Sequence, residues 1–515
     1  MAQSVNKIIK NTVYMYGNTI LTMFVSLYST RLILNSLGVS DFGIFSIVGG
    51  AIGMLGFLNG SMSTATQRFI NYAQGEGDKN GIRVIFNSSV IIHIILSLVV
   101  LAALEIAFFV YFNGVLNIPV DRINAAKWIY QFMVISAILA VLVSPYNASI
   151  NAHEDMGYLS LFGIVMCIGK LIIALCISIS PIDKLIFYGL GMAVIQWANL
   201  AVFYRYCKKH YPECILNIKK YADKKTIRKM FAYASYSLMS TLTSMLSVYG
   251  GNILINNFFG TLLNAAQGIA SQISGQIMVF SVSLKTAINP VIGKKAGSHA
   301  FQSMLKFAFT TSKLSFYLLS FFAIVFLVET PWILKIWLKT VPDWAVVFCR
   351  LEIIKNLLFQ FMEGPKSALM SEGRIRSFSI FESVLYVIPL PVIYMCFAKG
   401  LSPVVYYYIM ILFFNLIAGS SIIYFANKNC GMSICSFLKD VVGRGCITFA
   451  LVLLSSYIPH LLMAPSFIRT VLVFVVSTLM LALTVYFVGF NVDERNLVKK
   501  LYEAVAARRR NIVKK

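Results

Sequence analysis

The sequence has little charge, and acid is its scarcest kind. Only 12% of the 515 residues are charged, with 20 Asp and Glu against 44 Lys and Arg. Soluble globular chains carry about 25% charged residues, so the composition excludes an ordinary soluble protein. Because 58% of the residues are hydrophobic, a lipid bilayer has to solvate much of their surface. The composition therefore predicts an all-α membrane protein.

The sequence also lacks the patterns of metal, redox and nucleotide sites. Its nine cysteines form no C-x-x-C pair and its five histidines are scattered, so no zinc spacing can be assembled. It has no phosphate-binding loop of the form G-x-x-x-x-G-K-[ST]. No basic patch is interleaved with aromatic residues as in single-strand binders. We therefore expect no cofactor, no metal and no nucleic acid partner.

Long polar loops are absent as well, and apolar runs take their place. The longest expected external connection, residues 329–342, is too short for the catalytic domain of a membrane glycan polymerase or glycosyltransferase, so we do not expect an enzyme. The apolar runs predict about fourteen transmembrane helices. The expected spans are residues 12–34, 42–73, 84–112, 125–150, 157–180, 184–206, 230–257, 262–290, 304–328, 343–370, 376–398, 401–426, 444–463 and 466–489.

Lysine and arginine are distributed unevenly between the loops, which predicts the orientation. The even-numbered loops and both ends hold most of them, with the largest groups in residues 207–229 and 491–515. Basic residues favour the cytoplasmic side. The pattern predicts a multi-pass protein of the bacterial inner membrane with both termini in the cytoplasm. We also expect the tail, residues 491–515, to form a basic amphipathic helix on anionic lipid.

An internal repeat runs through the chain at a constant offset. It aligns Gly38 with Gly260 and Gly75 with Gly297, and both copies begin on the inner side, so the repeat is parallel. The expected parts are an N-terminal six-helix lobe, a cytoplasmic basic linker, a C-terminal six-helix lobe, two additional transmembrane helices and the basic tail. Their ranges are residues 1–206, 207–229, 230–426, 427–490 and 491–515.

Polar residues inside apolar spans are the candidate site residues, because charge within a bilayer is costly. In span 262–290 they recur at steps of three and four and share one helix face. We expect them to line a hydrophilic cavity together with three basic residues of the N-terminal half. The set is Arg31, Arg68, Lys170, Gln267, Ser271, Ser274, Ser281 and Lys285. The alternatives are packing between helices for the polar face, and snorkelling to the interface for Arg31.

A second group of charges shares one face of span 343–370: Glu352, Lys355, Glu363 and Lys366. Opposite charges three residues apart can neutralise each other, so internal ion pairs are one interpretation. Gating is the other: the pairs would open and close during a transport cycle. Lys366 could also snorkel to the interface.

Residues 10–69 hold the most distinctive local sequence. Arg31 ends the first span, LGVSDFGIF forms a turn at residues 37–45, and Gln67-Arg68-Phe69 closes a second span rich in small residues. This stretch resembles the opening of the polysaccharide-biosynthesis flippases, the O-antigen and capsule repeat-unit translocases. They belong to the multidrug/oligosaccharidyl-lipid/polysaccharide (MOP) exporter superfamily. The resemblance implies a MATE-like fold of two pseudo-symmetric six-helix lobes plus two C-terminal helices.

The resemblance also implies a function. Such a flippase would move undecaprenyl-diphosphate-linked oligosaccharide repeat units across the inner membrane by alternating access, with the glycan in a cavity between the lobes. Its expected partners are the lipid-linked glycan, membrane lipids and polysaccharide assembly proteins. The alternative within the superfamily is a MATE-type drug or cation antiporter, which would need acidic residues facing the cavity. Glu105 is the one such candidate in the N-terminal lobe.

Overall fold

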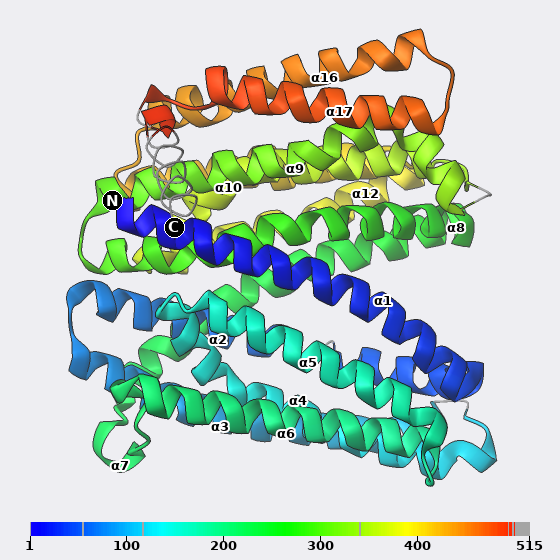
Figure 1. Cartoon of the computed structure of the whole chain (residues 1–515), viewed down its shortest axis with the longest axis vertical. Coiled ribbons are helices and arrows are strands. Elements are labelled where there is room, and N and C mark those ends of the chain that lie inside the picture. The colour runs from blue at the N-terminus through cyan, green and yellow to red at the C-terminus, as the bar shows by residue number, and fades with distance from the viewer. Residues whose placement is uncertain are drawn as a thin grey trace, which may run out of the picture. The chain divides into compact units, whose positions relative to one another are not determined.

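The computed structural model describes residues 2–53, 56–115, 118–338, 341–492, 494–496 and 499. Throughout this part the chain forms helices joined by short turns, and it contains no β-strand (Figure 1). Eleven of these helices are long and apolar enough to cross a membrane. The predicted all-α membrane fold is confirmed.

The number of fourteen spans stays a prediction. Helix α8 (Lys224–Gly297) covers two expected spans and counts once among the eleven. The expected span 42–73 is divided between the end of α1 (Ala2–Gly53) and α2 (Gly56–Glu76), and neither part qualifies. The expected span 343–370 corresponds to α10 (Ala345–Glu372), which is too rich in charge to qualify.

The chain divides into two compact units. The first, here called the N-terminal unit, comprises Ile8–Thr241 and Gly293–Ala300. Besides most of α1, all of α2 and parts of α8, it contains α3 (Lys79–Val110), α4 (Ile123–Ala152), α5 (Met156–Cys176), α6 (Lys184–His210), η4 (Pro212–Cys214) and α7 (Ile218–Tyr221). Residues 207–229, expected as a linker, pack within this unit. The Asn87 side chain accepts from the Asn217 backbone N–H at 2.9 Å and donates to the Ile215 carbonyl at 3.1 Å.

The second unit, the C-terminal unit, comprises Leu242–Ile292 and the described residues from Phe301 onward, together with residues 2–7. Its further helices are α9 (Phe301–Leu338), α10, α11 (Arg376–Val387), α12 (Pro389–Ala398), α13 (Val405–Met410), α14 (Ala418–Cys430), α15 (Ile434–Phe437), α16 (Arg444–Leu462) and α17 (Phe467–Thr484). Figure 1 shows α16 and α17 as a hairpin beside α9. Buried Ile324, Val452 and Leu481 join these three helices. The expected lobe boundaries stay predictions.

Helices α1 and α8 each contain one break, and the two breaks lie at equivalent positions of the predicted repeat. Gly38 has φ 82° and ψ 168°, and Gly260 has φ 81° and ψ −179°. This combination is accessible to glycine and strained for residues with a side chain. The repeat therefore pairs two glycines with the same unusual backbone, which supports it.

The ends of α2 and α8 also cross at a pair of glycines that the repeat aligns. A Cβ on Gly75 would overlap the carbonyl oxygen of Lys294, and a Cβ on Gly297 would overlap that of Tyr72. The same offset relates Tyr72 to Lys294, so the contact is reciprocal. Both helix ends belong to the N-terminal unit.

Candidate functional site

The polar face predicted on residues 262–290 packs along α10. Asn356 donates a hydrogen bond from its side-chain amide to the Ser274 hydroxyl, and the Ser281 hydroxyl donates to the Gln360 side-chain oxygen. The later residue on α8 bonds to the later residue on α10, so the two helices run parallel. This face of α8 therefore finds its hydrogen-bonding partners inside the C-terminal unit.

The residues at the two ends of this face of α8 also have partners inside the C-terminal unit. Near one end, the Tyr407 hydroxyl donates to the Gln267 side-chain oxygen, and the Gln267 amide nitrogen in turn lies 3.4 Å from the Ser271 hydroxyl. Towards the other end, Lys285 Nζ forms an ion pair with Glu363 Oε2 at 2.8 Å. The charge of Lys285 is thus met by α10. Whether any of these residues also contacts a substrate stays a prediction.

The charges of α10 predicted as a group all take part in ion pairs, but only one pair follows the i, i+3 spacing. Lys355 Nζ lies 2.7 Å from Glu352 Oε2 on the same helix. Glu363 pairs with Lys285 of α8, and Lys366 Nζ lies 2.6 Å from Glu382 Oε1 of α11. Two of the three pairs therefore join α10 to a neighbouring helix.

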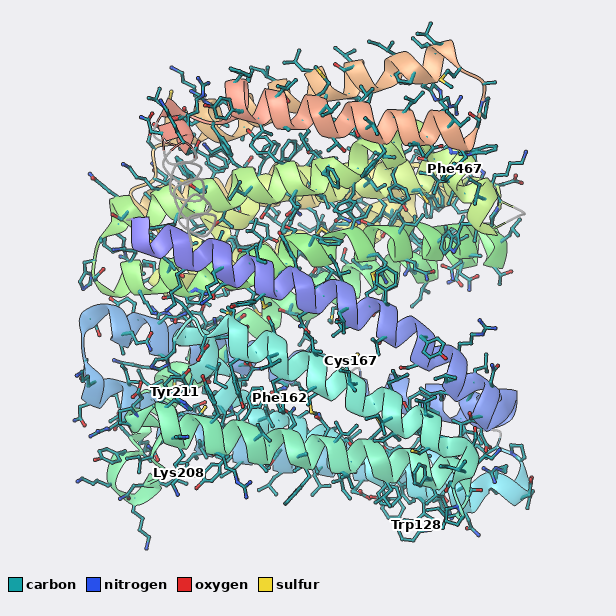
Figure 2. The ribbon with its side chains drawn as sticks, viewed as in Figure 1. Trp128, Phe162, Cys167, Lys208, Tyr211 and Phe467 are labelled. Atoms are coloured by element: carbon teal, nitrogen blue, oxygen red, sulfur yellow. The ribbon has the colours of Figure 1, made fainter. Side chains whose placement is uncertain are left out.

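Lys170 lies on α5, in the N-terminal unit. Contacts at both ends of α5 show that this helix runs parallel to α1. The Asn11 side chain donates to the Glu154 carbonyl at 2.9 Å, and the hydroxyls of Ser36 and Ser178 lie 3.0 Å apart. Cys167, labelled in Figure 2, lies on α5 within this seam and faces the Thr22 carbonyl at 3.9 Å.

The helical period places Lys170 on the α5 face that follows α1. It comes three residues after Cys167, whereas the exposed apolar residues Val165 and Ile172 lie on the opposite face. The Lys170 side chain is exposed, and it has no ion pair or hydrogen bond in the described part of the chain. It is a cation near the middle of an apolar helix that points away from that helix's apolar exposed face.

The other two basic candidates differ from Lys170. Arg31 is exposed on α1, and the helical period places it on the side of exposed Val13 and Phe24, which fits snorkelling near the helix end. The Arg68 guanidinium lies 4.8 Å from the ring centres of Phe69 and Tyr72 and 5.4 Å from that of Tyr233. Aromatic faces therefore stabilise the charge of Arg68.

Sequence reasoning missed several charges that the structure brings together. Glu382 lies within the expected span 376–398, and a carboxylate at such a position is itself a signal of function or pairing. Lys313 of α9 is buried and pairs with Glu494. Glu329 is fully buried; it accepts a hydrogen bond from Arg469 Nη2 at 2.7 Å and lies 3.1 Å from His460 Nδ1.

The stretch 37–45, expected as a turn, lies inside helix α1, where Gly38 is the residue with non-helical backbone angles. Arg122 pairs with Asp41 of this stretch and, at 2.6 Å, with Asp183, which also caps the start of α6. Burial acts to raise the pKa of Asp183, but hydrogen bonds from Arg122 and from the Ile186 and Leu185 backbone outweigh it and lower the pKa. The rings of Phe45 and Tyr188 pack in a T-shaped arrangement with their centres 5.1 Å apart. Contacts through Arg122 and Tyr188 thus join this part of α1 to α6.

In the described part, four carboxylates of the expected spans have partners, and Asp343, the first residue of span 343–370, is exposed. Glu105 accepts a hydrogen bond from Gln131 at 3.3 Å, and Glu352, Glu363 and Glu382 are paired with lysines. The described residues contain no group of three His, Cys, Asp or Glu side chains placed to hold a metal ion.

Comparisons with known proteins give the fold. No family model matches the chain, and no curated protein matches it. A multidrug resistance MATE family transporter of the MOP superfamily, solved in an outward-facing conformation, is similar with a TM-score of 0.70 at 13% identity. The match covers 82% of this chain and 95% of that one.

Two further solved structures are similar to the chain. MATE in its bent conformation has a TM-score of 0.71 at 12% identity over 83% of this chain and 97% of that one. A MOP superfamily transporter from Pyrococcus furiosus has a TM-score of 0.68 at 13% identity over 83% and 96%. For that protein, reverse polarity of the binding pocket is described as suggesting a different function. The chain therefore has the MATE transporter fold and is a multi-pass membrane protein whose structural neighbours are transporters.

Proposed function

We propose that this protein is a flippase for an anionic, lipid-linked substrate, an undecaprenyl-diphosphate-linked oligosaccharide repeat unit. It would move this substrate across the inner membrane by alternating access, for export of surface polysaccharide. The observation that carries the proposal is Lys170, an exposed cation near the middle of α5 without a partner in the described part of the chain.

The energetics of Lys170 favour an anionic ligand. A lone charge within the hydrocarbon layer is costly, so water or an anion has to compensate it. Its helix face follows α1 and carries Gly163 and Cys167, opposite to the exposed apolar face. A diphosphate reaching this face would meet a cation that no described carboxylate neutralises.

The carboxylates argue in the same direction. A site for organic cations needs a buried acid that is free to pair with the ligand. In the expected spans, Glu352, Glu363 and Glu382 already pair with lysines. Glu105 accepts a hydrogen bond from the Gln131 amide, and Asp343 is exposed at the first position of its span. This distribution supports an anionic substrate over a cationic one.

The length of the chain adds support. The match to the outward-facing MATE structure covers 95% of that protein but 82% of this chain, so this chain is the longer of the two. The two additional helices and the tail expected in residues 427–515 would account for such an extension. Two helices beyond the MATE fold are what the resemblance of residues 10–69 to repeat-unit flippases implies.

The test is transport by purified protein in proteoliposomes that contain a fluorescent lipid-diphosphate oligosaccharide. Lys170→Met should lower the rate about tenfold to a hundredfold, because one charge-assisted contact contributes ~1.5–3 kcal/mol. Lys170→Arg should retain more activity. Lys184→Met, which removes an exposed lysine at the start of α6, is the matched control and should leave the rate unchanged. A wild-type rate for Lys170→Met would contradict the proposal.

A MATE-type drug or cation antiporter is the second candidate, and the fold of the structural neighbours favours it. It predicts ion-driven uptake of a cationic dye in the same vesicles. Under this alternative, Lys170→Met should leave dye uptake intact or raise it, since a cation would no longer oppose the ligand. Dye transport without glycolipid transport would replace the flippase proposal by this one.

A further inference from the structure

A small hollow in the N-terminal unit is lined by none of the candidate residues above. Its volume is about 290 Å³, and its lining comes from the end of α2, the start of α3, the turn after α4 and the η4 segment. The polar lining residues are Gln74, Lys79, Arg83, His153 and Glu213. In Figure 2, Tyr211, whose ring stacks on His153 at 3.9 Å, is labelled towards the same end as Lys208.

The acid in the hollow already has a hydrogen-bonding partner. His153 Nε2 lies 2.8 Å from Glu213 Oε1, and His153 Nδ1 lies 2.8 Å from the Ser149 carbonyl oxygen. Burial acts to raise the pKa of Glu213, but the His153 hydrogen bond, with smaller effects that include the charge of Arg83, lowers it.

The two remaining charges in the lining are basic and available. Lys79 and Arg83 are four residues apart on α3 and therefore share one helix face. Neither side chain has an ion pair within 4 Å in the described part, although Arg83 lies near enough to Glu213 to help lower its pKa. Arg83 is half-buried. Burial removes part of the water around its guanidinium group, so contact with an anion is favourable.

The remaining polar residue of the lining, Gln74, contacts the histidine. Its side-chain amide lies 3.3 Å from His153 Nε2. Lys79 and Arg83 are thus left as the surplus positive charge of the hollow.

We infer that this hollow binds the phosphate group of an anionic membrane lipid. Arg83 has the fork geometry that matches phosphate oxygens, and Lys79 adds a mobile point charge. The lining also contains Ile82 and Pro212, and the apolar stretch of α3 begins at residue 84, so the hollow lies at the level where headgroups meet hydrocarbon. The positive-inside pattern predicts that this is the cytoplasmic leaflet.

A bound headgroup would stabilise the region where several elements of the N-terminal unit meet. The turn after α4 already connects to η4 through His153 and Glu213, and to the end of α8 through Glu154 and Lys294. A phosphate on Lys79 and Arg83 would add the start of α3 to these connections. Because a ligand that binds only the folded state stabilises it, occupancy should raise the melting temperature. This inference does not depend on which substrate the protein carries.

The experiment uses the full chain in phosphatidylcholine nanodiscs, titrated with short-chain phosphatidylglycerol, with thermal unfolding as the readout. The double variant Lys79→Met/Arg83→Met should melt like the wild type in neutral lipid. It should require about tenfold or more phosphatidylglycerol for the same shift, since two charge-assisted contacts are lost. The matched control is Lys208→Met/Lys209→Met, which removes two exposed charges at the end of α6 and should respond like the wild type.

Three outcomes would overturn the inference. Equal loss in both double variants would attribute the effect to general surface charge. An equal shift with inorganic phosphate in neutral nanodiscs would assign the hollow to a soluble phosphate rather than a lipid. Absence of any lipid-dependent shift in the wild type would remove the site altogether.

Discussion

In the C-terminal unit, Lys285, Lys355 and Lys366 each lie within 2.8 Å of a carboxylate oxygen. In the N-terminal unit, Lys170 has no carboxylate partner in the described part of the chain. Both kinds of lysine occupy helices that are expected to cross the membrane. A lysine in an apolar helix can therefore serve either of two purposes. When a carboxylate of the chain pairs with it, it joins helices; when none does, it is available to a ligand.

The largest effect on stability is expected at the Lys366–Glu382 pair of the C-terminal unit. The side chain of Glu382 is 1% exposed and also accepts a hydrogen bond from the Tyr386 hydroxyl at 2.9 Å. Glu382→Ala leaves Lys366 without its partner, and we expect a loss of about 3–5 kcal/mol in the free energy of unfolding. Thermal unfolding in detergent measures it.

Two control variants separate the effect of breaking an ion pair from the effect of removing a charge. The double variant Lys366→Met/Glu382→Met should recover most of the loss, because an apolar pair of similar volume often replaces a buried ion pair without cost. Lys170→Met should leave stability within about 0.5 kcal/mol of the wild type. If Lys170→Met destabilised the protein as much as Glu382→Ala, the distinction between the units would be lost.

The next largest effect should come from the pair between Lys313 and Glu494. Lys313 is 2% exposed, and Glu494 also exchanges hydrogen bonds with Asn491 at 2.8 and 2.9 Å in a capping box. Glu494→Ala should cost about 3 kcal/mol, because it leaves a buried cation unpaired. Glu494→Gln keeps a polar group and should cost less in the same unfolding assay. Equal losses for both variants would argue against the charge as the cause.

The repeat predicts matched effects at Gly38 and Gly260. A Cβ at either position meets nothing within 4 Å, so the cost of Gly38→Ala and Gly260→Ala is conformational strain alone, about 1–3 kcal/mol each. Gly60→Ala, in a helical position that is equally open, should be neutral or slightly stabilising. A large effect in one copy and none in the other would show that the two breaks are not equivalent.

The smallest effect concerns the Arg122 cluster of the N-terminal unit. The folded-state pKa of Asp183 is lowered, so its contribution to stability is present above the unfolded pKa of about 3.9 and is lost as pH falls through the lower folded value. Arg122→Gln should therefore reduce the melting temperature slightly at pH 7, with at most about 1 kcal/mol lost. The difference from the wild type should shrink below about pH 4. A difference that grows on acidification would be inconsistent with this sign.

Several features of the fold could be predicted from local patterns. The apolar runs predict helices because only helices and closed barrels satisfy the backbone inside a bilayer. The internal repeat aligns the two glycine breaks, since a backbone conformation accessible only to glycine leaves a sequence signal. The period of span 262–290 predicts a shared polar face, and in the structure Ser274, Ser281 and Lys285 all contact one neighbour, α10.

Other features could not be predicted because they depend on which helices are neighbours. The i, i+3 spacing suggests that Glu363 would pair with Lys366, but Lys285 and Glu382 are the partners in space. For residues 491–515 the sequence predicts an amphipathic helix on anionic lipid. Most of that segment lies outside the described residues, so this stays a prediction.

The sequence by itself determined that this is an all-helical membrane protein, and it predicted the repeat that aligns the glycine breaks of α1 and α8, because hydropathy and glycine positions are local properties of the chain. Tertiary structure decided which lysines are neutralised and which one is left exposed. Lys170, Lys285 and Lys366 look alike in the sequence, since each is a lysine in an apolar run. They differ because a carboxylate from a distant part of the chain reaches two of them and none in the described part reaches the third. Coulomb attraction falls with distance, and only the packed helices set those distances.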